Sequence, residues 1–357
     1  MFSKIHFLYT EKSIKHNSLL TKRILYDTIK SIKILFMICR IIKCMEGIGM
    51  NSAVSVMETM AQRYNQLYLT PKKGISETGV YTDIVHYGKT PPEVAVKMNE
   101  GLSGFKCSKY DKLFSETTPA GKVDIVYIHE RSDFERFIQI MAYRGEPANV
   151  SSSLESAEIV GITNWRKIEQ HMNEYIDHGG NELSWRDELK KFRGEKKNYQ
   201  DTLIIISNCD YSGVNADEAG FGELVWNQLS LKIRIYNACA LYTCRRIYKK
   251  CNSILLEEIF GDCVGMLFAL NKYDTSLARK FMGVSGKKYN GVGRLKSLVL
   301  GMDDVDIDKV AVNVSTVIDK VETCVKKMIS SGVTDYYEIL SGLEEKANTY
   351  ISILEHK

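Results

Sequence analysis

The chain has 357 residues, of which 44% are hydrophobic and 26% charged, so it can bury a large core and is not a low-complexity or fibrous sequence. Its formal net charge of +4 originates at one end: residues 1–44 hold seven Lys and two Arg against Glu11 and Asp27, which leaves residues 45–357 slightly acidic. Because nucleic-acid-binding domains usually carry a strongly basic face, we expect no nucleic acid among the partners of this protein.

Residues 1–49 form a basic leader whose most apolar part is the run 32–43. Charged side chains interrupt that run, whereas a membrane-spanning helix needs about 20 consecutive residues with few charges. Two interpretations stay open. The leader is either an amphipathic helix on an anionic membrane, or a segment that is not translated because synthesis starts at Met45 or Met50. Membrane contact is expected only through the leader, if it is present.

The nine cysteines are scattered along the chain, and no CxxC pair occurs. Disulfide frameworks use an even number of cysteines at regular spacing, whereas reduced thiols lie singly within apolar segments. The pattern therefore favours a cytoplasmic protein.

Two segments in the first half of the body have the pattern of β-strands. Residues 123–128 alternate and are β-branched, and residues 202–207 are a continuous apolar run of the kind found at a sheet centre. Apolar periodicity predicts helices over 52–68, 132–143 and 165–177, with a short one after Pro91 and Pro92. The charged run 186–199 is expected to be a solvated helix and loop.

After Gly222 the sequence is helical almost to its end. We predict helices near 223–250, 254–271, 275–282, 290–300, 306–331 and 334–353, and no proline after Pro147 interrupts them. The fold class is therefore α+β, with a small sheet packed against a predominantly helical C-terminal half.

The segments 233–246 and 255–262 resemble the helix pair of gluzincin-type zincin metallopeptidases. In that family the first helix carries His-Glu-x-x-His, and a second, antiparallel helix carries Glu-x-x-x-Asp. Two His and the second-helix Glu bind Zn²⁺, and the Asp orients a ligand His. The resemblance implies that Glu258 matches the third zinc ligand and Asp262 the orienting carboxylate.

Three departures remove the metal chemistry. Asn237, Ala238 and Leu241 stand where the family has His, Glu and His, so neither the two imidazole ligands nor the general base is present. We therefore expect a pseudoenzyme with a degenerate metallopeptidase site, no cofactor, and a binding or regulatory role with a protein or peptide partner. Two alternatives stay open, a helical structural or interaction protein unrelated to peptidases and an enzyme with an unrecognised site.

The resemblance also sets the predicted organisation of the chain. The basic leader covers residues 1–49, an N-terminal α+β part residues 50–200, a zincin-like core with the helix pair residues 201–301, and a C-terminal helical part residues 302–357.

Two further groups of residues are candidates for binding. His171, Glu174 and His178 lie near one face of the predicted helix 165–177, where they could hold a metal, although a solvated face is the favoured interpretation. The other group borders a possible cleft at the loop after residue 143, and it consists of Arg144, Glu146, Asn149 and Trp165.

Overall fold

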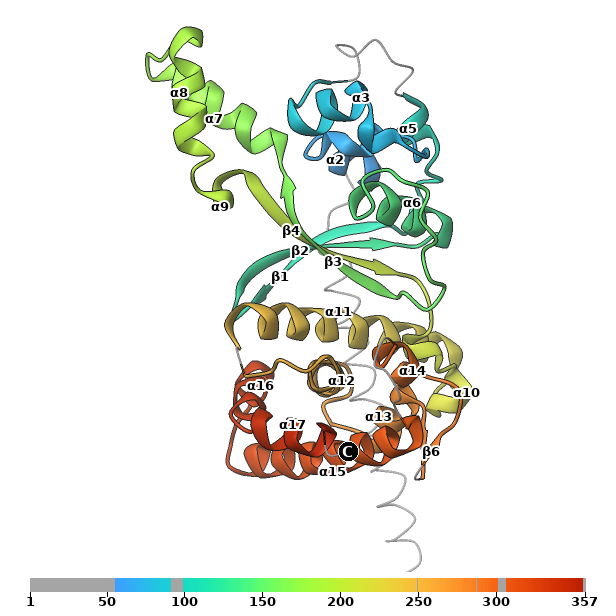
Figure 1. The fold of residues 1–357 in the computed structure, drawn as a ribbon. Helices are drawn as coiled ribbons and strands as arrows, with labels where there is room; N and C mark the ends of the chain where they lie inside the picture. The colour runs from blue at the N-terminus through green and yellow to red at the C-terminus, as the bar shows by residue number, and fades with distance from the viewer. Residues whose placement is uncertain (1–54, 91–98, 249, 287, 301–305, 356–357) are drawn as a thin grey trace, which may run out of the picture. The chain divides into compact units, whose positions relative to one another are not determined.

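A four-stranded sheet lies at the centre of the computed structural model, which describes residues 55–90, 99–248, 250–286, 288–300 and 306–355 (Figure 1). Residues 54–357 form one compact unit. The leader and the helix expected after Pro92 lie outside the described residues. Within the described residues, no helix has the length and apolar character needed to cross a membrane.

The sheet runs in the order β1-β2-β4-β3, formed by β1 (Lys112–Thr118), β2 (Gly121–Ile128), β3 (Ser156–Thr163) and β4 (Gln200–Ser207). The central strands β2 and β4 are parallel, and each edge strand pairs antiparallel with its neighbour. The central pair contains both strands that the sequence predicts. The edge strands were not predicted, because β1 is largely polar and Gly161 interrupts β3.

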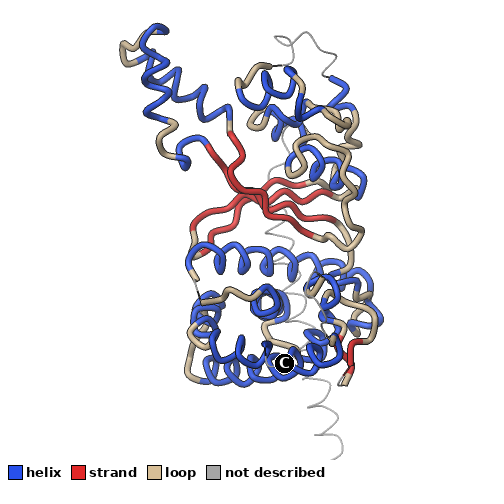
Figure 2. Tube along the Cα trace, viewed as in Figure 1, coloured by secondary structure: helices blue, strands red, loops and turns tan. Residues whose placement is uncertain are grey.

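Each face of the sheet is covered by helix (Figures 1 and 2). On one face, Leu203 and Ile205 of β4 pack in a core with α6 (Arg131–Met141), α2 (Val56–Ala61) and the 3₁₀ turn η1 (Asn65–Tyr68). On the other, Ile204 and Ile206 pack against α11 (Glu223–Ile247). A continuous apolar strand is therefore buried on both sides, as predicted for 202–207.

Beyond α11 the chain adds a helical layer of α12 (Ile254–Leu270), α13 (Thr275–Met282), α14 (Leu295–Leu298), α15 (Ile307–Ser330), α16 (Tyr336–Glu344) and α17 (Ala347–Glu355). Helices α11 and α12 approach closely because Gly265 has no side chain: a Cβ there would lie 2.5 Å from the carbonyl oxygen of Ile233. The α+β class is confirmed, with a small sheet and a helical C-terminal half.

Three predicted helices differ from the structure. The helix predicted over 52–68 ends at Ala61 and gives way to η1, where the Asn65 side chain donates to the carbonyl of Gly88. The segment 290–300 forms only the short α14, preceded by a two-stranded hairpin of β5 (Val284–Ser285) and β6 (Lys288–Tyr289). The helix over 334–353 is divided into α16 and α17.

The remaining elements are short or lie at the edge of the sheet. Helix α7 (Trp165–Asp177) follows β3, as predicted, and packs against α8 (Glu182–Phe192), which leads to α9 (Lys196–Tyr199) and β4. The others are η2 (Ile75–Glu77), α3 (Gly79–Tyr81), η3 (Thr82–His86), α5 (Asn99–Ser103), η4 (Tyr211–Gly213) and α10 (Ala216–Ala219).

Candidate functional site

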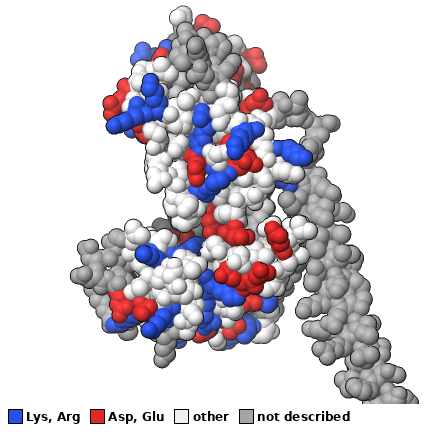
Figure 3. All heavy atoms as spheres, turned by 90° about the vertical axis from the view of Figure 1, so that its right-hand side faces the viewer, with Lys and Arg blue, Asp and Glu red and all other residues white. Residues whose placement is uncertain are grey.

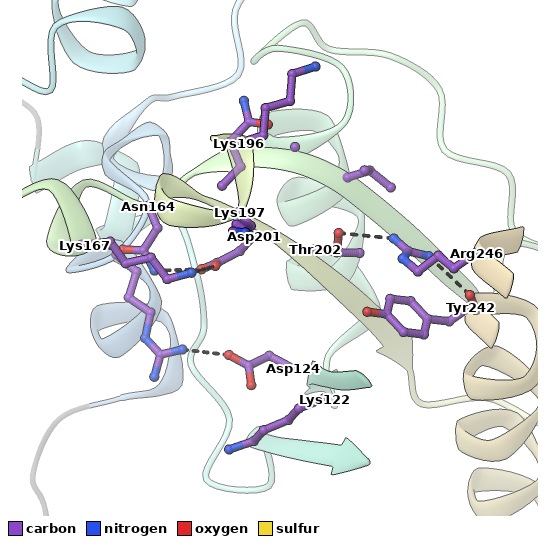
Figure 4. Close-up of a pocket in the computed structure, with 14 residues that line it drawn as sticks. Lys122, Asp124, Asn164, Lys167, Lys196, Lys197, Asp201, Thr202, Tyr242 and Arg246 are labelled. Carbon is purple, nitrogen blue, oxygen red and sulfur yellow. Dashed lines mark hydrogen bonds and ion pairs between the residues drawn. The ribbon is translucent and has the colours of Figure 1, made fainter. Parts of the chain in front are cut away.

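A pocket of about 750 Å³ opens at the end of the sheet where β2 and β4 begin and β3 ends (Figure 4). Its walls come from these three strands, from helices α7, α9 and α11, and from the turn after α2. The lining residues are Arg63, Lys122, Asp124, Val160, Gly161, Asn164, Lys167, Lys196, Lys197, Gln200, Asp201, Thr202, Tyr242 and Arg246.

Asp201, at the start of β4, anchors one side of the pocket. Its carboxylate accepts hydrogen bonds of 2.6 Å from Lys167 Nζ, Asn164 Nδ2 and the Tyr64 hydroxyl. Burial by itself would raise the pKa of Asp201, but these three donors outweigh it, and the pKa lies below its ordinary value. Asp201 is therefore a fixed negative charge that holds Lys167 at the pocket wall.

Asp124 of β2 holds a second cation in a similar way. Arg63 Nη1 lies 2.9 Å from one Asp124 oxygen, and the Ser115 hydroxyl donates to the other at 2.6 Å. The side chains of Arg63 and Asp124 stay 28% and 29% exposed, so both can still contact a ligand.

The opposite wall is formed by the last turns of α11, as Figure 4 shows. The Arg246 guanidinium lies over the Tyr242 ring, 3.7 Å from its centroid, and donates to the Thr202 hydroxyl at 3.2 Å. It also pairs with Glu158 of β3 at 2.5 Å. Cation–π and ionic contacts therefore fix this arginine with one edge toward the pocket.

A bulge in β3 shapes the rim between these walls. The register of β3 against β4 shifts between Val160 and Ile162, and Gly161 there has φ +76°, a conformation that favours glycine. The bulge leaves the Val160 residue 66% exposed beside the pocket. The rim thus offers apolar as well as charged surface.

The pocket is strongly cationic. Six basic side chains line it against two carboxylates, and among the described residues no carboxylate pairs with Lys122 or Lys196. By contrast, acidic and basic side chains are interspersed on the face drawn in Figure 3. Sequence reasoning did not find this site, because its residues are spread from position 63 to position 246 and share no local motif. The nearest signal was the charged run 186–199, which contains Lys196 and Lys197.

The helix pair α11–α12 brings three of the five zincin-related positions together. Asn237 Nδ2 lies 3.3 Å from Asp262 Oδ1, and both residues are buried. Arg294, next to α14, pairs with Asp262 and also with Glu258 at 2.8 Å. The Tyr211 hydroxyl donates to the same Asp262 oxygen at 2.6 Å. A partly exposed arginine thus lies at the centre of the cluster.

The side chains at the other two positions make no hydrogen bond or ion pair with this cluster. Ala238 packs in the core between α11 and the sheet, with Ile204 and Ile206. Leu241 is buried, and neither residue can bind a cation or move a proton.

Asp262 has a raised pKa, which is unusual for a carboxyl group paired with an arginine. Burial raises its pKa from the ordinary 3.8 to about 6, and the positive charge of Arg294 opposes that rise. The second Asp262 oxygen has no hydrogen-bond partner among the described residues, so the ionised form is incompletely compensated.

The four residues of the predicted cleft do not line the pocket. Glu146 accepts hydrogen bonds from the Gly74 and Ser76 amides at 2.9 and 3.2 Å, which ties the loop after α6 to the turn at η2. Arg144 lies over the Tyr81 ring, Asn149 is exposed, and Trp165 packs against Gly88. The Arg144–Glu146 loop therefore has a structural role in this fold.

The residues of the possible metal site, His171, Glu174 and His178, do not converge on one point, and the two histidines contact different groups. His171 stacks on Phe192 and lies 3.2 Å from Glu188, while His178 Nδ1 lies 2.6 Å from the backbone oxygen of Glu174. Within the described part of the chain, no group of three or more His, Cys, Asp or Glu side chains is placed to hold a metal ion.

Comparison with known proteins gives one relationship. The model of a family of unknown function (DUF7005) matches residues 42–341, and the chain belongs to that family. No curated protein and no solved structure matches the chain.

Proposed function

We propose that this member of the DUF7005 family is a binding protein that holds an anionic, phosphate-bearing ligand in the pocket at the start of β2 and β4. The observation that supports it is the charge of the lining, six basic side chains against two carboxylates, in a volume of about 750 Å³. Pockets of a few hundred cubic ångströms hold ligands of the size of a metabolite.

The cations of the pocket are divided between fixed and free. Arg63, Lys167 and Arg246 are held by carboxylates, so they are in position before a ligand arrives. Lys122 and Lys196 are exposed and can turn toward an anion. Hydrogen bonds between ammonium or guanidinium groups and phosphate oxygens are about twice as strong as those between neutral groups. The arrangement therefore favours phosphate over a neutral ligand.

The test is titration calorimetry of the full chain with inorganic pyrophosphate. We expect binding that weakens as salt rises, because the lysines are exposed to screening. The double variant Lys122→Glu/Lys196→Glu should lose about 10- to 100-fold in affinity. The matched control is Lys309→Glu/Lys320→Glu, two exposed lysines on α15 outside the pocket. Equal losses in both variants, or failure of the unmodified chain to bind pyrophosphate, inorganic phosphate and a phosphate ester alike, would refute the proposal.

The expected protein or peptide partner is compatible with this pocket if the bound segment is acidic or phosphorylated. A short single-stranded oligonucleotide offered in the same titration checks the expectation that nucleic acid is not a partner. Binding of the oligonucleotide that Lys122→Glu/Lys196→Glu abolishes would contradict that expectation while leaving the anion site in place.

We also propose that the α11–α12 pair is a degenerate zincin-like site in which the Arg294 guanidinium supplies the positive charge. The support for this is that one guanidinium pairs with both Glu258 and Asp262, and that Asn237 donates a hydrogen bond to Asp262. The guanidinium places one positive charge beside the two carboxylates, at the position where the resemblance would place the zinc ion. The alternative is an interaction module with no peptidase ancestry. For such a module, histidines introduced at the two ligand positions should not create a zinc site, so zinc binding separates the two proposals.

A further inference from the structure

We infer that the ligand of the pocket is a phosphate ester of a hydroxyl-rich carbon skeleton, such as a sugar phosphate, rather than an inorganic anion or a polyphosphate. The inference rests on the proposed anion-binding function and assigns its ligand class. It depends on the two features of the lining that an inorganic anion would not use, the carboxylate of Asp124 and the apolar rim.

The first feature is the position of Asp124 among the cations. A carboxylate beside an inorganic anion repels it, whereas a carboxylate beside a hydroxyl accepts a charge-assisted hydrogen bond. Asp201 is saturated by three donors and is only 15% exposed at its side chain. Asp124 has two protein donors and remains 29% exposed, so it keeps acceptor capacity for a ligand.

The second feature is the carbon surface at the rim. Val160 is exposed at the β3 bulge and lines the pocket, whereas Tyr242 on the opposite wall is buried beneath Arg246. An inorganic anion gains nothing from apolar contact, whereas the carbon atoms of a sugar do. Cations for the phosphate, an acceptor for hydroxyls and carbon surface for the ring therefore occur in one pocket.

The cations on α9 and α11 indicate where the phosphate would bind. Lys196 and Lys197 lie on α9, across the pocket from Asp124, and Arg246 presents its guanidinium from α11. A phosphate on these groups avoids the negative charge of Asp124, and the hydroxyls of the same ligand would then face that carboxylate. The ligand is oriented by charge at one end and by hydrogen bonds at the other.

Calorimetry with ribose 5-phosphate and with inorganic phosphate tests the inference. We expect the unmodified protein to bind ribose 5-phosphate at least about 10-fold more tightly, because hydroxyl contacts to an ionised acceptor add to the phosphate contacts. Asp124→Asn should remove most of that preference, and its affinity for inorganic phosphate should be unchanged or higher, since Arg63 is released. If Asp124 had only a structural role, Asp124→Asn would lower the affinity for both ligands by the same factor.

The matched control is Asp319→Asn, which breaks an Arg–Asp pair with Arg279 between α13 and α15, away from the pocket. It should leave the preference intact. Equal affinity for the two probes in the unmodified protein, or parallel losses in Asp124→Asn, would overturn the inference and leave the anion site standing. Failure of pyrophosphate and both probes to bind would overturn the proposed function itself.

Discussion

Arg294 pairs with Asp262 in the interior of the helical layer, and this contact joins the segment before α14 to the middle of α12. The Asp262 side chain is 1% exposed and that of Arg294 is 16% exposed. Arg294 also pairs with Glu258, so one guanidinium contacts two carboxylates. We therefore expect substitutions of Arg294 to lower the free energy of unfolding substantially.

Arg294→Met should lower the free energy of unfolding by about 3–5 kcal/mol, because it leaves the buried Asp262 without its cation. Urea denaturation of the full chain measures the loss. The control is Arg245→Met, whose side chain is 42% exposed and pairs with Glu158 and Glu257 at the surface; its loss should be within about 1 kcal/mol. The double variant Arg294→Met/Asp262→Asn should recover part of the loss. Equal effects of the two Met variants would contradict the central role of Arg294.

Acid should favour the folded state through Asp262. Its pKa is about 6 in the folded protein and near 3.8 when the side chain is free in water, so the folded state binds the proton more tightly. The stabilisation by protonation is fully present below pH 3.8 and is lost as the pH rises through about 6. It amounts to on the order of 3 kcal/mol.

The measurement is the unfolding free energy of the unmodified protein minus that of Asp262→Asn, followed from pH 4 to pH 7. This difference should fall as the pH rises, since the variant has no proton to lose at this position. A difference that rises with pH would mean that Arg294 and Tyr211 outweigh the effect of burial on Asp262.

The close approach of α11 and α12 depends on glycine. Gly265→Ala would place a Cβ 2.5 Å from the carbonyl oxygen of Ile233, a backbone atom in α11 that cannot turn away. We expect a loss of about 2 kcal/mol or more in unfolding free energy, measured by urea denaturation. Gly79→Ala is the control, because nothing lies within 4 Å of a Cβ there. An unchanged or higher stability of Gly265→Ala would show that the helix pair can separate at little cost.

The parts of the fold that the sequence predicts are those with a strong apolar period. Strand 202–207 is apolar on both faces because helices cover both sides, and the apolar stripes of α7 and α15 follow helical spacing. Strand β1 could not be predicted in this way, because its outer edge faces solvent and its sequence is polar. The apolar pattern of a short segment indicates which of its residues are buried. An edge strand is recognised instead by its backbone hydrogen bonds to the neighbouring strand, and these are not visible in the sequence.

The candidate sites divide along the same line. The zincin resemblance groups Asn237, Glu258 and Asp262 with Ala238 and Leu241. In the structure Asn237 contacts Asp262, and Arg294 pairs with both carboxylates. Arg294 could not be predicted, because it lies 32 residues beyond Asp262 and reaches the cluster through the tertiary fold. The pocket has no such local part, because Arg63 and Arg246 are far apart in the sequence and line one cavity only through the tertiary fold.

Restoring metal ligands tests whether the helix pair is a degenerate zincin-like site. Asn237→His and Leu241→His supply two imidazoles at i and i+4, and Glu258 supplies the carboxylate. We leave Ala238 unchanged, because it packs against Ile204 and Ile206, where a glutamate would bury a charge. This double variant should stay free of zinc, because Arg294 pairs with the Glu258 carboxylate and its positive charge repels a divalent cation. Adding Arg294→Ala should allow one zinc ion per chain to bind, measured by elemental analysis after gel filtration.

The control adds Glu258→Ala to that triple variant and should lose the metal. Circular dichroism and urea denaturation confirm that each protein is folded before its zinc is counted. A folded triple variant that stays metal-free would show that the two His positions do not face Glu258, and the zincin resemblance would then be a coincidence of spacing. Stoichiometric zinc in the double variant that keeps Arg294 would show that the guanidinium does not stand in the cation position. If the triple variant binds zinc and loses it when Glu258→Ala is added, the side chains at positions 237, 241 and 258 must all reach the same ion. That is the arrangement that the resemblance implies.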